Sequence, residues 1–167
     1  MTLVVEDGTG KVNAESYVSV TDADTYHSNL GNADWTGVTA VKEAALRKAT
    51  QYMQQMYSDR WTGYRNTSTQ ALDWPREYVE IKGLRYTEYV EDTDIPQEMV
   101  NACAALAVRA LSDDLIPDQE RAVVSESIDV ISVTYSEFSA QQKRYPEVDK
   151  MVAKYMLTAS GIPMIRV

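Results

Sequence analysis

The sequence predicts a mainly α-helical fold, a small bundle of about four helices with one short β-hairpin and one long irregular loop. Apolar residues recur at three- and four-residue steps in segments 41–56, 99–110 and 148–156, which is the period of a helix with one buried face. Apolar and polar residues alternate at 131–136, which is the period of a strand. With 167 residues, we expect a single helical domain, residues 1–161, followed by a C-terminal tail, residues 162–167.

Two helices are expected in the N-terminal third. Thr21 precedes acidic residues and is predicted to cap a short helix that Gly31 ends. Thr39 is predicted to begin a longer helix with one apolar face, formed by Val41, Ala45, Ala49, Tyr52, Met53 and Met56.

A central helix is expected after Asp94, the predicted cap, with Pro96 in the first turn, where a missing N–H is tolerated. Because the segment through Ala110 is apolar on nearly every side, other helices should surround it. It is predicted to end at Pro117 at the latest.

A hairpin and a last helix complete the predicted fold. Val123 and Val124 are expected to pair with residues 131–135 through a turn at Ser125-Glu126-Ser127. Tyr145-Pro146 should begin the last helix, which Gly161 is expected to end.

Residues 60–89 lack a helical or strand period and contain aromatic residues beside turn formers. A loop of this length is unusual in a small domain unless it is functional or held in place. Trp61 and Trp74 are large enough to hold it by burial, and we prefer this structural interpretation.

The composition narrows the classes of function. The formal net charge of −9 disfavours binding to a phosphate backbone, because that affinity comes from Lys and Arg. One cysteine and one histidine cannot form a disulfide or a Cys/His metal site, so we expect a reducing cytoplasm. Neither a membrane span nor a signal peptide is predicted.

No catalytic set is predicted, and we expect neither enzymatic activity nor a cofactor. Gly8-Thr9-Gly10-Lys11 departs twice from the phosphate-loop motif and is interpreted as a turn before the first helix. His27 lies on the polar side of a short helix, so a solvated or capping role is expected. Cys103 is interpreted as a small buried apolar residue.

Acidic residues and tyrosines are the remaining candidates. None of the acidic clusters fits a calcium loop, and capping is the preferred role for those at helix starts. Eleven tyrosines against one phenylalanine suit half-buried helix edges, and in part an assembly surface. The acidic clusters are Asp22/Asp24, Asp92/Asp94 and Asp113/Asp114/Asp118.

Several segments along almost the whole chain carry a family resemblance. They include Val5-Glu6-Asp7-Gly8-Thr9-Gly10, the helix Lys42–Thr50, Gln70-Ala71-Leu72-Asp73-Trp74-Pro75-Arg76, Ile95-Pro96, Ile131–Tyr135 and Tyr145-Pro146-Glu147-Val148-Asp149. In this order they resemble phage and prophage proteins named DnaT-like single-stranded-DNA-binding proteins, related by fold to the head–tail adaptors of tailed phages.

The resemblance implies a mainly helical structural protein of the virion, made in the bacterial host cytoplasm. Such an adaptor forms a dodecameric ring at the head–tail interface, between the portal protein and a tail protein, and DNA passes its lumen without specific binding. An acidic lumen would repel phosphates. The candidate portal contacts are the tail residues Ile162, Pro163, Met164, Ile165, Arg166 and Val167.

The alternative function is single-stranded-DNA binding, as the family name implies. Aromatic residues would stack on bases beside arginines that bind phosphates. Against this, Trp74-Pro75-Arg76 could be a core anchor, with the arginines paired to neighbouring acids. The residues of this alternative site are Arg60, Trp61, Tyr64, Arg65, Trp74 and Arg76, with Arg85 and Tyr86 nearby.

Overall fold

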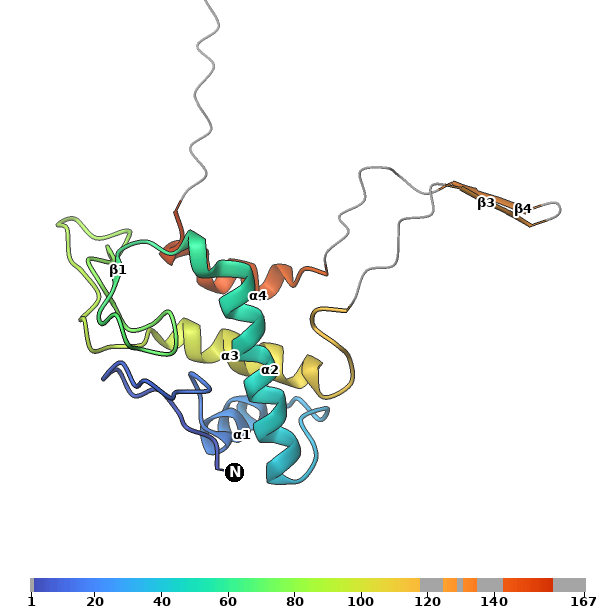
Figure 1. Cartoon of the computed structure of the whole chain (residues 1–167), viewed down its shortest axis with the longest axis horizontal. Helices are drawn as coiled ribbons and strands as arrows, with labels where there is room; N and C mark the ends of the chain where they lie inside the picture. The colour runs from blue at the N-terminus through green and yellow to red at the C-terminus, as the bar shows by residue number, and fades with distance from the viewer. Residues whose placement is uncertain (1, 118–124, 129–130, 135–142, 158–167) are drawn as a thin grey trace, which may run out of the picture.

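The computed structural model describes residues 2–117, 125–128, 131–134 and 143–157. Four helices dominate it, which confirms the mainly α-helical prediction (Figure 1). The helices are α1 (Val20–Asn29), α2 (Thr39–Tyr57), α3 (Gln97–Ala110) and α4 (Pro146–Val152), and two short 3-10 turns are η1 (Ser58–Arg60) and η2 (Ala153–Tyr155). No helix in these residues is both long and apolar enough to span a membrane.

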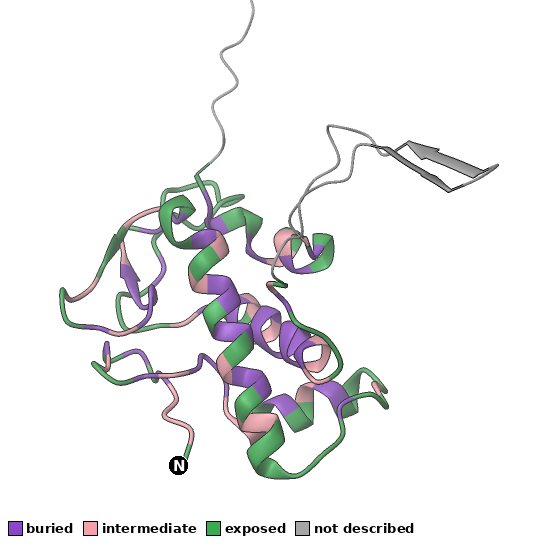
Figure 2. Ribbon diagram, turned by 45° about the vertical axis from the view of Figure 1, so that its right-hand side comes forward, coloured by how far each residue is buried: buried purple, intermediate pink, exposed green. Residues whose placement is uncertain are grey.

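Helix α3 lies at the centre and packs against α1, α2 and α4. Most of its length is buried (Figure 2), as its nearly uniform apolar sequence predicts. Met99, Ala102, Cys103, Leu106 and Ala107 are fully buried. Small alanines on several sides let three helices approach one backbone closely, so the alanine-rich segment determines how the bundle is arranged.

Two predicted helix caps were wrong. The α1 cap is Ser19, whose hydroxyl oxygen accepts the Asp22 N–H at 3.1 Å, so Thr21 lies inside the helix. The α3 cap position is Pro96 and not Asp94, with an extended backbone (ψ 139°) and no capping side chain. Both errors are two residues long. Ser19 and Thr21 can both cap a helix, whereas α3 begins after Pro96 without any capping side chain, so a search for capping residues places its start too early.

The buried face of α2 is confirmed in its central part. Ala45, Ala49, Tyr52 and Met53 are buried, whereas Val41 in the first turn is 48% exposed. Leu46, Thr50 and Tyr57 widen this face beyond the predicted residues, and Met56 is half-buried.

The predicted hairpin exists, but its turn was misplaced. Strands β3 (Ser125–Ile128) and β4 (Ile131–Thr134) pair antiparallel, with Ile128 opposite Ile131. The expected turn residues Ser125-Glu126-Ser127 therefore lie in a strand, and Val123 and Val124 are outside the described residues. Helix α4 ends at Val152 and η2 follows it; Gly161, its predicted end, is also outside them.

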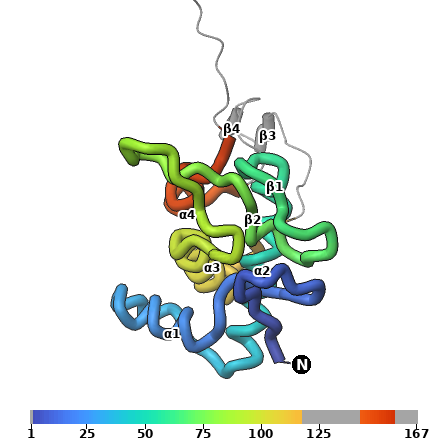
Figure 3. The backbone as a smooth tube through the Cα atoms, turned by 90° about the vertical axis from the view of Figure 1, so that its left-hand side faces the viewer, coloured from blue at the N-terminus to red at the C-terminus, as the bar shows by residue number. Residues whose placement is uncertain are grey.

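A second strand pair lies in the loop after α2. Strands β1 (Tyr64–Arg65) and β2 (Arg76–Glu77) pair antiparallel, with Tyr64 opposite Glu77. Apart from these two short strands and isolated bridges, residues 61–89 are irregular, as predicted, and the irregular loop continues to residue 96. Figure 3 shows this loop beside the N-terminal segment, and the Ala71 N–H donates to the Lys11 carbonyl at 2.9 Å.

Candidate functional site

The loop at residues 61–96 is anchored by two buried tryptophans, which confirms the structural interpretation. Trp61 and Trp74 are 4% and 0% exposed, and their rings meet edge to face at 6.0 Å. The Trp61 indole N–H donates to Asp73 at 3.2 Å, and the Tyr17 hydroxyl accepts the Asp73 N–H at 3.1 Å. The sequence motif around Trp74 is therefore part of the core.

The arginines beside these tryptophans bind backbone carbonyls and not acids, contrary to prediction. Arg76 is buried and donates to the carbonyls of Thr62 and Gly63 at 2.9 and 2.8 Å. Burial lowers the pKa of its guanidinium. Arg65 donates to the carbonyls of Gln70 and Leu72. Both arginines satisfy carbonyls of the irregular loop, so they are structural.

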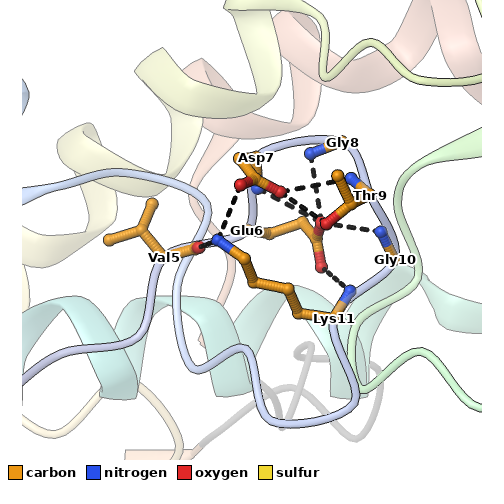
Figure 4. Close-up of polar contacts among 7 residues, drawn as sticks. All are labelled: Val5, Glu6, Asp7, Gly8, Thr9, Gly10 and Lys11. Atoms are coloured by element: carbon orange, nitrogen blue, oxygen red, sulfur yellow. Dashed lines mark hydrogen bonds and ion pairs between the residues drawn. The ribbon is translucent and has the colours of Figure 1, made fainter.

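A second anchor is the Glu6 nest, which we define as the Glu6 carboxylate and the turn Gly8-Thr9-Gly10-Lys11 (Figure 4). Glu6 is 3% exposed, and its Oε1 accepts the N–H groups of Asp7, Gly8 and Gly10 at 3.2, 3.0 and 2.9 Å. Its Oε2 accepts the Lys11 N–H at 2.8 Å. The turn is confirmed, and the chain's own carboxylate occupies the position an anion would take in a phosphate loop.

The Glu6 nest supports the loop directly. A Cβ built on Gly8 would lie 1.8 Å from the Thr93 carbonyl oxygen, so these two backbones are in close contact. Gly8 has a φ of 93°, which only glycine adopts readily. The nest therefore positions the loop end that leads into α3.

The outer surface of the same loop carries three exposed tyrosines in contact, which we call the tyrosine patch: Tyr64, Tyr78 and Tyr89. They are 72%, 66% and 52% exposed. Tyr78 meets Tyr64 edge to face at 6.5 Å and Tyr89 at 6.2 Å. Pairing of β1 with β2 and a bridge between Glu80 and Tyr89 bring the three rings together.

Of the eight residues in the alternative DNA site, five are exposed, and one of these, Arg65, has its guanidinium engaged by loop carbonyls. Tyr64 belongs to the tyrosine patch, and Arg60 is exposed in η1. Arg85 and Tyr86 are exposed and contact each other, with the guanidinium 5.6 Å from the ring centre. Sequence reasoning missed Tyr78 and Tyr89, although the excess of tyrosine over phenylalanine indicated such a surface.

His27 is buried, so its predicted solvated role was wrong. It is 1% exposed because α1 packs on α3, where its Nε2 lies 3.1 Å from the Ala104 carbonyl oxygen. Its Nδ1 lies 3.3 Å from the Asn32 amide nitrogen, and its ring lies 4.8 Å from that of Trp35. The neutral ring satisfies both partners by donating from Nε2 and accepting at Nδ1, and burial lowers its pKa.

The other candidate groups have structural partners. Cys103 is buried with its sulfur 3.3 Å from the Thr50 hydroxyl, as predicted, and burial raises its thiol pKa. Asp24 binds Lys42 and the Trp35 indole at 2.7 and 2.6 Å. Among the residues that the structure describes, no three His, Cys, Asp or Glu side chains gather as metal ligands. The tail, residues 162–167, and Asp118 lie outside these residues.

The fold and surface define a small helical domain that displays exposed tyrosines on an anchored loop. The chain belongs to the family described as "Putative DnaT-like ssDNA binding protein", whose model matches residues 1–167. No curated protein and no solved structure matches the chain.

Proposed function

We propose that the protein binds single-stranded DNA and that the tyrosine patch stacks on the bases. The observation that carries this proposal is a row of three exposed rings, with Tyr78 in contact with both others, on a loop whose interior is fixed by Trp61, Trp74 and Glu6. Exposed aromatic rings on a rigid support bind bases of any sequence, at about 1–3 kcal/mol per stacked base. The family description supports the same class of ligand.

The charge of the part of the loop that carries the tyrosine patch supports this location. Residues 60–89 contain five Lys or Arg and four Asp or Glu, in a chain whose net charge is −9, whereas Glu91, Asp92 and Asp94 make the far end of the loop acidic. Phosphates would therefore meet less repulsion beside the tyrosine patch than at that acidic end. The acidic remainder predicts weak binding at physiological salt and stronger binding at low salt.

The test measures fluorescence anisotropy of a labelled oligo-dT of twenty nucleotides at low salt. Tyr64→Ala and Tyr89→Ala should each reduce affinity about 5- to 150-fold, the equivalent of 1–3 kcal/mol. Tyr86→Ala is the matched control, because Tyr86 is equally exposed but contacts Arg85 and not the tyrosine patch. Absence of binding by the unmodified protein, or an equal loss in all three variants, would overturn the proposal.

A second proposed role is the ring-forming head–tail adaptor, and one observation favours an assembly role of this kind. In the described part of the chain, β3 and β4 contact each other but no other helix or strand. An isolated two-stranded hairpin is marginally stable, and its edges are open to strands of another chain. A second copy of this chain would supply such strands in a homo-oligomeric ring.

Quantitative mass spectrometry of purified phage particles tests the adaptor role. A copy number near that of the portal protein supports a structural ring in the virion, and absence from particles rejects it. Deleting residues 162–167 should abolish docking on the portal without unfolding the domain. Unchanged docking would show that the tail is not the portal contact.

A further inference from the structure

A cleft of about 440 Å³ lies beside the loop and is lined by four basic side chains: Arg60, Lys82, Arg144 and Lys150. All four residues are exposed. Of the described residues that line the cleft, Asp149 is the one acidic residue, and its carboxylate accepts the Tyr57 hydroxyl at 2.8 Å. This concentration of positive charge is unexpected in a chain with nine more acidic than basic residues.

Among the residues that the structure describes, none forms an ion pair with any of these four cations. Each ion pair among the described residues involves a different Lys or Arg, such as Lys42 with Asp24 and Lys154 with Glu98. Four like charges around one cavity repel each other, and an anion in the cavity would remove that cost. The cleft is therefore chemically suited to a phosphate group.

The walls of the cleft are held by backbone contacts between distant segments. The Leu157 N–H donates to the Arg60 carbonyl at 2.7 Å, and the Thr62 N–H donates to the Tyr155 carbonyl at 2.9 Å. The backbone at Arg60 is therefore held against the segment that follows α4, and Lys150 lies in α4 itself. This backbone support keeps Arg60 and Lys150 on the walls of one cleft, where both can reach the same phosphate.

We infer that this cleft binds backbone phosphates of the single strand whose bases stack on the tyrosine patch. The inference rests on the proposed function. Lys82 connects the two surfaces, because it follows Glu80 in the same loop segment, and Glu80 bridges to Tyr89 of the tyrosine patch. A strand that crosses this segment places its bases on the tyrosines and its phosphates at the cations.

The slope of log affinity against log salt concentration for the labelled oligo-dT tests the inference. Each phosphate contact contributes about 0.7 to the size of that slope for a single strand, so Arg60→Gln and Lys150→Gln should each reduce it by about 0.7. Lys48→Gln is the matched control, because Lys48 is exposed on α2 outside the cleft and its variant should keep the full slope. Equal thermal unfolding midpoints would show that all variants are folded.

The outcomes separate this inference from the proposed function. If the tyrosine variants lose affinity while Arg60→Gln and Lys150→Gln keep the full slope, the cleft is not the phosphate site and the proposed function stands. If the unmodified protein binds no oligo-dT, both are overturned. If a poly-glutamate peptide binds instead, with the same dependence on Arg60 and Lys150, the cleft serves an acidic protein partner and not DNA.

Discussion

The Glu6 nest provides the sharpest test of how the loop is supported. Replacing Glu6 by Gln keeps the shape of the side chain but removes its charge and exchanges one acceptor oxygen for an NH₂ donor. In the better of the two orientations, the amide oxygen takes the place of Oε1 and still accepts three N–H groups. The NH₂ group then faces the Lys11 N–H, which Oε2 accepts at 2.8 Å in the native protein.

The expected cost follows from these contacts. A hydrogen bond to a charged acceptor contributes about 1.5–3 kcal/mol, and the variant loses one such bond and places donor against donor. The other three bonds become neutral and weaken, since charge-assisted bonds are about twice as strong as neutral ones. We expect Glu6→Gln to lower the free energy of unfolding by about 2–4 kcal/mol, a large part of the roughly 5–15 kcal/mol typical of a domain.

Urea unfolding followed by circular dichroism measures this change. For an m-value of about 2 kcal/mol/M, the midpoint should fall by about 1–2 M. Glu91→Gln is the control, because Glu91 is exposed and its variant should stay within about 0.5 kcal/mol of the native protein. A change of less than 0.5 kcal/mol for Glu6→Gln as well would refute the role of the nest.

Three further predictions test the core and the turns. Because the pKa of His27 is lowered in the folded protein, the unfolded chain takes up a proton first as the pH falls, and the free energy of unfolding should decrease below about pH 6.5. Urea midpoints at pH 7.5 and 5.5 should therefore differ less in His27→Gln than in the native protein. The Cys103 thiol, buried and with a raised pKa, should react with a disulfide reagent only after unfolding, and fast labelling of native protein would contradict its burial. Gly8→Ala should cost about 2–5 kcal/mol through backbone strain and contact with Thr93, whereas Gly31→Ala, with open space around it, should cost about 1–2 kcal/mol; equal urea midpoints would refute the close contact.

Periodicity predicted the helices well because each buries one face against a common centre. Helix α3 shows this most directly, since its apolar residues on nearly all sides meet three other helices. Helix ends were predicted less well. Ser19 and Thr21 have the same capping chemistry, so residue type alone does not determine which of them begins the helix. The turn of the hairpin was misplaced for a related reason, because serines are common both in turns and in exposed strands.

Burial of polar groups was the least predictable property. His27 lies among polar residues in the sequence, yet α1 directs it into the interface with α3, where a helix carbonyl and Asn32 satisfy its ring. Glu6 was not a candidate for any role, because acidic residues before a glycine turn, such as Glu6-Asp7, are common. The sequence does contain one indication of the nest, which is the pair of glycines within five residues after a glutamate. Such glycines allow neighbouring backbone N–H groups to point at one carboxylate.

The aromatic and basic residues of the loop show why residue type alone could not locate a DNA site. Trp61, Trp74 and Arg76 are residue types that single-strand binders use, but here they are buried in the core. The rings pack the interior of the loop, and the Arg76 guanidinium donates to carbonyls that have no partner in regular secondary structure. Because the tryptophans already anchor the loop from inside, the loop does not need to bury Tyr64 and Tyr78, and both remain exposed on its outer surface. The same reasoning applies to charge: a net value of −9 describes the whole chain, whereas a ligand meets only the cations that line one cleft. The sequence therefore predicted the chemistry of this loop, and the fold determines which of its residues a ligand can reach.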